Sequence, residues 1–125
     1  MSTRQANWQG SNWIRKDKRL AIYLRDDWRC LYCDRSLKNV KPRQRTLDHV
    51  IPVALGGDNE ATNLVTCCKK CNDRKQDRHV QEFCKFNREA IQRIIMAIVR
   101  PINRDLAKQI LAGEIDLCSV KRSTK

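Results

Sequence analysis

Apolar positions recur at two different periods along this chain, and the two periods predict different elements. Between residues 13 and 26 they follow helical spacing, which predicts an amphipathic helix over 13–26. A β-branched run around Asp48 and His49 predicts a short strand, the glycines at 56–57 predict the turn region of a hairpin, and 63–65 is expected to be extended. The first half of the chain is therefore expected to be a helix followed by a hairpin.

The second half of the chain is patterned for helices. A charged helix is expected to begin near Cys68. Apolar residues then keep a helical period from Val80 to the Arg100–Pro101 break, and a last helix over roughly 102–112 is expected to end at Gly113 as its C-terminal cap. Together these elements predict a small α+β fold with helices on both sides of the hairpin.

The length of 125 residues allows one domain with a small core. We expect a polar tail over 1–12, a core over 13–80 and a C-terminal helical extension over 81–125 that packs on this core. In so small a core, a structural metal site can supply folding free energy on the order of 10 kcal/mol.

The charge of the chain favours a polyanionic partner. The chain carries 26 basic and 14 acidic residues, a net charge of +12, and has no long apolar run that would suit a membrane span. DNA or RNA fits this charge. Residues 35–45 are the most concentrated basic run, and Pro42 indicates a loop or an extended segment there. We expect backbone contacts to DNA from six residues that flank the predicted strand or share the following helix, and only solvated surface from about half of the 26 basic residues. These six are Arg43, Arg45, Lys69, Arg74, Lys75 and Arg78.

Two Cys-x-x-Cys pairs enclose the predicted hairpin. They are Cys30 with Cys33 and Cys68 with Cys71. Four thiolates at this spacing match a closed tetrahedral zinc site, which would fix the two sides of the hairpin relative to each other. Free buried thiols or a disulfide are the alternatives. Cys67 is an alternative to Cys68, but only Cys68 has the x-x spacing to Cys71.

The remaining cysteines and the start of the chain bear on the cellular compartment. Cys84 and Cys118 have no partner at metal spacing and are expected to be small core residues. Four of the seven cysteines fall in metal-spaced pairs, and residues 1–10 contain no apolar signal segment. We therefore expect a reducing, cytoplasmic location.

The hairpin segment contains the residues that could cleave a phosphodiester. Asp48 offers a hard oxygen for a divalent ion, and His49 can accept a proton from water near neutral pH. Adjacent strand residues point to opposite sides, so the two can share a site only if the hairpin bends or a helix wraps around the strand. Asn63 follows the hairpin, and Asn72 follows Cys71 in the run Cys71-Asn72-Asp73-Arg74-Lys75.

Taken in order, the cysteine pairs, Asp48-His49, Asn63 and Asn72 resemble an HNH endonuclease over about residues 14–80, with the second and third motif letters both Asn. The resemblance implies a ββα-metal fold in which His49 is the general base, Asn63 orients it, and Asp48 and Asn72 bind the catalytic ion. Two oxygen ligands favour Mg²⁺ or Mn²⁺ at that position. Asp73 and His79 are alternatives to Asn72.

These observations predict a metal-dependent DNA endonuclease with a structural Zn²⁺. One Asp-His pair supplies one hydrolytic centre, so a monomer should nick one strand. We expect a monomer rather than a homodimer, because the apolar stripe of Ile91, Ile94, Ile95 and Ile98 is needed for the core. The alternative is a zinc-stabilised nucleic-acid-binding module without cleavage. A redox-responsive zinc regulator that uses Cys67 and Cys68 is a third hypothesis.

Overall fold

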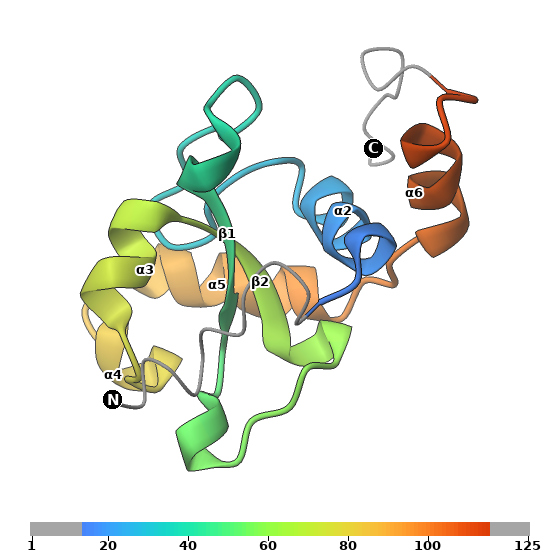
Figure 1. Cartoon of the computed structure of the whole chain (residues 1–125). Helices are drawn as coiled ribbons and strands as arrows, with labels where there is room; N and C mark the ends of the chain where they lie inside the picture. Colours follow the sequence, from blue (N-terminus) through green and yellow to red (C-terminus); the bar gives the residue numbers. More distant parts are fainter. Residues whose placement is uncertain (1–13, 116–125) are drawn as a thin grey trace.

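A two-stranded antiparallel sheet lies at the centre of the fold (Figure 1). The computed structural model describes residues 14–115. Strand β1 (Arg45–His49) pairs with β2 (Leu64–Cys68), with Arg45 opposite Cys68 and His49 opposite Leu64. The predicted hairpin is therefore present, and its strands are joined by the long connection 50–63.

Five helices surround this sheet in the described part of the chain, which confirms the predicted α+β class. The predicted polar tail, Trp13 at the start of the first helix and Cys118 lie outside the described residues. The helices are α2 (Lys16–Arg25), α3 (Lys69–Lys75), α4 (Val80–Phe83), α5 (Arg88–Ile98) and α6 (Arg104–Leu111), and short 3₁₀ turns lie at Pro42–Gln44, Val53–Leu55 and Ala61–Asn63.

Two hydrophobic clusters fix the helices against the sheet. In the first, Val65 and Cys67 of β2 pack with the cysteine-bearing loop and with Ile94 of α5. In the second, Leu64 of β2 packs with α2 and with Ala107 of α6. Helices α2 and α6 lie side by side although they are far apart in the sequence (Figure 1). Helices from both ends of the described chain thus enclose the hairpin.

The periodic segment 80–98 is two helices rather than one. Helix α4 ends at Phe83, and Asn87 caps the start of α5, where its side-chain oxygen accepts a hydrogen bond from the backbone N–H of Ala90 at 3.1 Å. An asparagine that satisfies the free N–H groups of a helix start favours a new helix over continuation of the old one. The segment predicted to keep a helical period from Val80 to the Arg100–Pro101 break is therefore interrupted at 84–87.

The later helices otherwise follow the predicted pattern. Ile94 is buried and Ile91 and Ile98 pack against the core, whereas Ile95 is 50% exposed. Gly113 follows α6 with φ +81°, as expected of a C-terminal cap. Among the described residues, no helix has both the length and the apolar character needed to cross a membrane.

Candidate active site and cysteine cluster

The four predicted ligand cysteines come together at one point. Cys30 and Cys33 lie in the loop before β1, Cys68 ends β2, and Cys71 lies in the first turn of α3. Their four sulfur atoms all lie within 4.8 Å of one another. A tetrahedral zinc with bonds of about 2.3 Å holds its sulfurs about 3.8 Å apart, and the Sγ atoms of Cys33 and Cys68 are 3.9 Å apart. The cluster therefore fits a metal ion such as zinc.

The position of Cys67 settles the choice between the adjacent cysteines. Its Sγ donates a hydrogen bond to the carbonyl oxygen of Cys68 at 3.2 Å, and it is not a member of the cluster. Burial raises the pKa of the Cys67 thiol well above its usual value. Cys68 instead accepts a hydrogen bond at its Sγ from the backbone N–H of Cys71. Cys84 is buried in the hydrophobic core, as predicted.

The side chains of Asp48 and His49, at the end of β1, contact different partners. The carboxylate of Asp48 contacts Lys75 of α3, whereas the Nε2 atom of His49 lies 2.7 Å from the Oδ1 atom of Asn59 in the connection 50–63. This divergence is what alternation along a strand dictates. Because an amide oxygen only accepts hydrogen bonds, Nε2 of the imidazole is the donor, and the neutral ring then has its lone pair on Nδ1.

Asn63 holds the connection that carries Asn59. Its Oδ1 accepts from the backbone N–H of Ile51 at 2.8 Å, and its Nδ2 donates to the carbonyl oxygens of Ile51 and Asp58. Gly57 lies against the same backbone: a Cβ atom there would be 1.7 Å from the carbonyl oxygen of Ile51. Asn63 thus shapes the loop around His49, and the imidazole donates its hydrogen bond to Asn59.

The carboxylate of Asp48 is enclosed by hydrogen-bond donors. Its Oδ2 accepts from the hydroxyl of Tyr32 at 2.6 Å and lies 2.9 Å from the Nζ of Lys75. Burial raises the pKa of Asp48, and the Lys75 ammonium opposes this rise. Burial and the nearby carboxylate also raise the pKa of Tyr32, so its hydroxyl stays protonated as a donor.

Asn72 binds a different residue of the same strand. Its Nδ2 donates to the Oγ1 of Thr46 at 3.0 Å, so that α3 places Asn72 beside Thr46 and Lys75 beside Asp48. The structure therefore gives Asp48 and Asn72 separate partners on one face of β1 rather than a shared position. Of the alternatives to Asn72, Asp73 pairs with Lys69 at 2.8 Å and His79 caps the start of α4.

The predicted DNA-contacting residues divide into exposed and enclosed groups. Lys75 has no exposed side-chain surface, because its ammonium is drawn to Asp48, so it cannot contact a DNA backbone as predicted. Arg45 is half-buried and donates to the carbonyl oxygens of Leu37 and Val40, which ties down the basic loop. The exposed members of the predicted set are Arg43, Lys69, Arg74 and Arg78.

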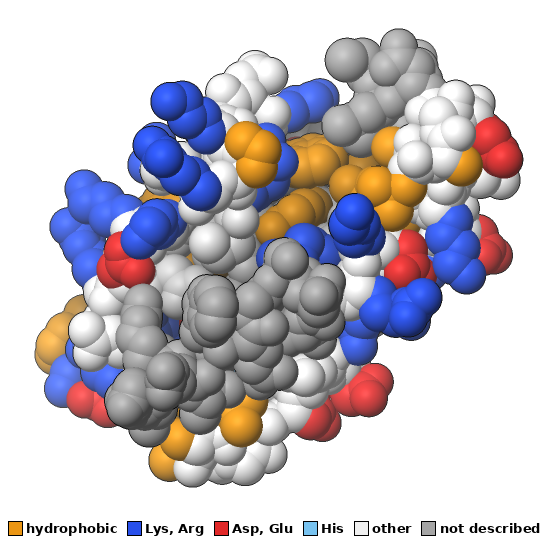
Figure 2. Space-filling view, viewed as in Figure 1, with side chains coloured by type: hydrophobic (Ala, Val, Ile, Leu, Met, Phe, Trp, Pro, Cys, Tyr) orange, Lys and Arg blue, Asp and Glu red, His pale blue; other side chains and the backbone are white. Residues whose placement is uncertain are grey.

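Exposed basic side chains cover the loop before β1 and helix α3. In Figure 2 many Lys and Arg side chains lie at the upper left, over these two segments, and others lie at the right of the molecule. Lys38, Lys41 and Lys70 are further exposed basic residues of these two segments. A surface of this kind attracts a phosphate backbone without reading its sequence.

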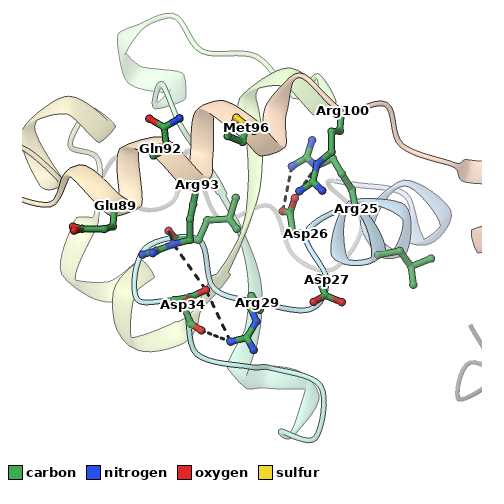
Figure 3. Close-up of a pocket in the computed structure, with 12 residues that line it drawn as sticks. Arg25, Asp26, Asp27, Arg29, Asp34, Glu89, Gln92, Arg93, Met96 and Arg100 are labelled. Carbon is green, nitrogen blue, oxygen red and sulfur yellow. Dashed lines mark hydrogen bonds and ion pairs between the residues drawn. The ribbon is translucent and has the colours of Figure 1, made fainter. Parts of the chain in front are cut away.

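A separate hollow lies away from these residues. A cavity of about 470 Å³ lies between α5 and the loop after α2 (Figure 3). Its charges largely compensate one another: Arg25 pairs with Asp26, and both Arg29 and Arg93 approach Asp34. None of the predicted catalytic residues lines this cavity, so it does not serve the Asp48–His49 pair.

The segment that contains the cysteine cluster and the two strands was compared with known protein families. Residues 30–86, called the HNH segment below, match the HNH endonuclease family. The match confirms the resemblance, and the HNH segment contains both cysteine pairs, the whole hairpin, α3 and α4. No curated protein gave a significant match to the chain.

Two residues of the HNH segment have contacts that the sequence patterns did not predict. Asn59 reaches His49 through a fold of the connection, and neither a period nor a local spacing could have indicated that contact. The position of Lys75 in the sequence did indicate that its side chain faces the sheet. It lies three residues after Asn72 and so on the same face of the helix, which turns it toward β1 rather than toward solvent.

Proposed function

We propose that the chain is a metal-dependent DNA endonuclease of the HNH type that hydrolyses phosphodiester bonds. The observation that carries this proposal is the family match over the segment that also contains the cysteine cluster and the His49–Asn59 contact. In this proposal Zn²⁺ is structural and bound by Cys30, Cys33, Cys68 and Cys71. We place the enzyme in the reducing cytoplasm, where thiolates remain available to the metal.

His49 is proposed as the general base. Asn59 contacts Nε2 and would orient the ring that accepts the proton of the attacking water. His49 is only 5% exposed, so the surface above it has to open for a phosphodiester to reach the ring. Asn63 is proposed as a positioning residue that maintains the loop on which Asn59 lies. Mg²⁺ or Mn²⁺ remains the prediction for the catalytic ion, which would neutralise charge on the phosphate, but its predicted ligands Asp48 and Asn72 are paired with Lys75 and Thr46 in the structure.

The basic surface over α3 and the preceding loop is proposed to bind the DNA backbone. Arg43, Lys69, Arg74 and Arg78 are the exposed members of the predicted set. With one His49 per chain, a monomer would cut one strand at a time. Most of the apolar stripe of α5 contributes to the core rather than to the surface, which supports a monomer over a homodimer.

The contacts of Asp48 and Asn72 favour a second candidate function. Because the carboxylate is paired with Lys75 and the amide with Thr46, a zinc-stabilised nucleic-acid-binding module without cleavage is the alternative. Plasmid nicking and a gel-shift assay on the same zinc-loaded protein separate the two. An endonuclease both shifts and nicks DNA, whereas a binding module shifts DNA and leaves supercoiled plasmid intact.

A further inference from the structure

Lys75 is a buried cation beside the candidate active site. Its side chain is 0% exposed, although it occupies the last position of a short, highly charged helix. Its Nζ donates to the carbonyl oxygen of His49 at 2.8 Å and lies 2.9 Å from Oδ2 of Asp48. A buried ammonium loses its hydration and needs a counter-charge to offset that loss. Asp48 supplies this counter-charge.

The same carboxylate is the predicted ligand of the divalent ion. Its Oδ2 is already bound by the ammonium of Lys75 and the hydroxyl of Tyr32. A divalent cation on this carboxylate would lie close to the ammonium, and like charges repel strongly where water is excluded. The second predicted ligand, Asn72, bonds to Thr46. As arranged, these residues do not fit an ion held jointly by Asp48 and Asn72.

We propose that Lys75 is a resident counter-cation of Asp48, which competes with a divalent ion for that carboxylate. The ammonium has two acceptors, so it can release the carboxylate and keep the carbonyl oxygen of His49. Lys75 is then a positioning residue: it fixes the backbone of the Asp-His pair and weakens ion binding there. The importance of this competition for catalysis rests on the proposed endonuclease function, but the competition itself does not.

The test measures Mn²⁺ binding to the zinc-loaded full chain by electron paramagnetic resonance, together with the effect of Mn²⁺ on Tm. Lys75→Met removes the charge at similar side-chain length. The expected result is a Kd for Mn²⁺ lower than that of the wild type by about tenfold or more, because the like-charge repulsion is gone. Mn²⁺ should also raise the Tm of Lys75→Met more than that of the wild type. Unchanged or weaker Mn²⁺ binding by Lys75→Met would overturn the proposal and leave Lys75 as a structural anchor.

Two control variants make the result specific. Lys70→Met, which removes an exposed lysine of the same helix, should bind Mn²⁺ like the wild type. The double variant Asp48→Asn with Lys75→Met removes both charges of the pair, so it should fold but lose the gain in Mn²⁺ affinity. If it keeps the gain, the ion is not bound at Asp48 and the proposal fails. If Lys75→Met folds only with Mn²⁺, the ion has replaced the ammonium as proposed; if Mn²⁺ cannot restore folding, the proposal is overturned.

These measurements do not depend on cleavage. A wild-type protein that never nicks plasmid would overturn the proposed function, while a tighter Mn²⁺ site in Lys75→Met would still support the competition. Conversely, an active nuclease whose Lys75→Met variant gains no Mn²⁺ affinity would retain the proposed function and lose this inference.

Discussion

The imidazole of His49 and the amide of Asn59 lie 2.7 Å apart, between Nε2 and Oδ1. This contact joins the end of β1 to the connection 50–63 and determines which ring nitrogen carries the proton in the neutral ring. A general base needs such an orienting partner, because the lone pair has to face the water that it deprotonates. Asn59 is therefore the residue by which the connection 50–63 orients the proposed general base.

Replacing Asn59 tests this positioning role. Asn59→Ala should lower kcat for plasmid nicking by about 10- to 100-fold, since the ring loses its fixed orientation, while DNA binding in a gel shift stays unchanged. Asn59→Asp keeps an oxygen acceptor at the same position and should recover most of the activity. If Asn59→Ala nicks at the wild-type rate, or if Asn59→Asp is as impaired as Asn59→Ala, the orienting role is wrong.

Local spacing accounts for what the sequence predicted well. Cys-x-x-Cys spacing places two sulfurs on one side of a turn whatever the rest of the fold does, so the cluster could be predicted, including Cys68 in place of Cys67. The hairpin and α6 with Gly113 were predictable for the same reason, because period and turn chemistry are local. The start of α5 was also signalled locally, because Asn87 is a favourable N-cap residue, but the spacing of apolar residues alone did not indicate it.

Contacts between distant segments account for what the sequence did not predict. Asn59 meets His49 because Asn63 and Gly57 bend the connection back toward β1. Lys75 was assigned to the surface because it is basic and shares the helix after the hairpin, but Asp48 draws its ammonium inside. Arg45 likewise holds carbonyl groups of the preceding loop instead of pointing to solvent. In each case the partner lies on another element, which a charge count does not reveal.

The cysteine cluster should be required for folding. Cys30→Ser or Cys71→Ser removes one of the four thiolates that lie together, so zinc content should fall and the protein should unfold or aggregate. Cys84→Ser is the matched control, because it alters a buried cysteine outside the cluster. Metal analysis and circular dichroism give the result. A soluble, active Cys30→Ser protein without zinc would contradict a structural role for the metal.

Gly57 should be required for the loop that carries Asn59. Gly57→Ala places a Cβ atom where the carbonyl oxygen of Ile51 lies, 1.7 Å away, and should cost about 1–3 kcal/mol of the free energy of unfolding as well as nicking activity. Gly56 has φ +97°, which strains any L side chain, but no atom lies within 4 Å of the position that a Cβ atom would occupy, so Gly56→Asn adds backbone strain without a steric clash and should destabilise the protein less than Gly57→Ala. Denaturant unfolding compares the two. Equal stability losses would contradict the close approach at Gly57.

Exposed arginines of the basic surface should set the salt dependence of DNA binding. Arg43→Ala and Arg74→Ala should each reduce the slope of log K against log salt by about 1, as expected for the loss of one phosphate contact. Lys108→Ala on α6 removes an exposed charge outside this surface and should leave the slope unchanged. Binding isotherms at several salt concentrations provide the slopes. If Lys108→Ala has the same effect as Arg74→Ala, DNA contacts are not confined to the basic surface.

The most direct test of the proposed function is a plasmid time course with zinc-loaded wild type and His49→Ala, each in Mg²⁺, Mn²⁺ or EDTA. The wild type should produce nicked circles well before linear DNA with a divalent ion and none with EDTA, from a particle of monomeric mass by light scattering. His49→Ala should bind DNA but nick at least about 100-fold more slowly, because a general base acts in the transition state. Supercoiled plasmid that stays intact with wild type in both metals, or His49→Ala that nicks within about tenfold of wild type, would contradict the assignment.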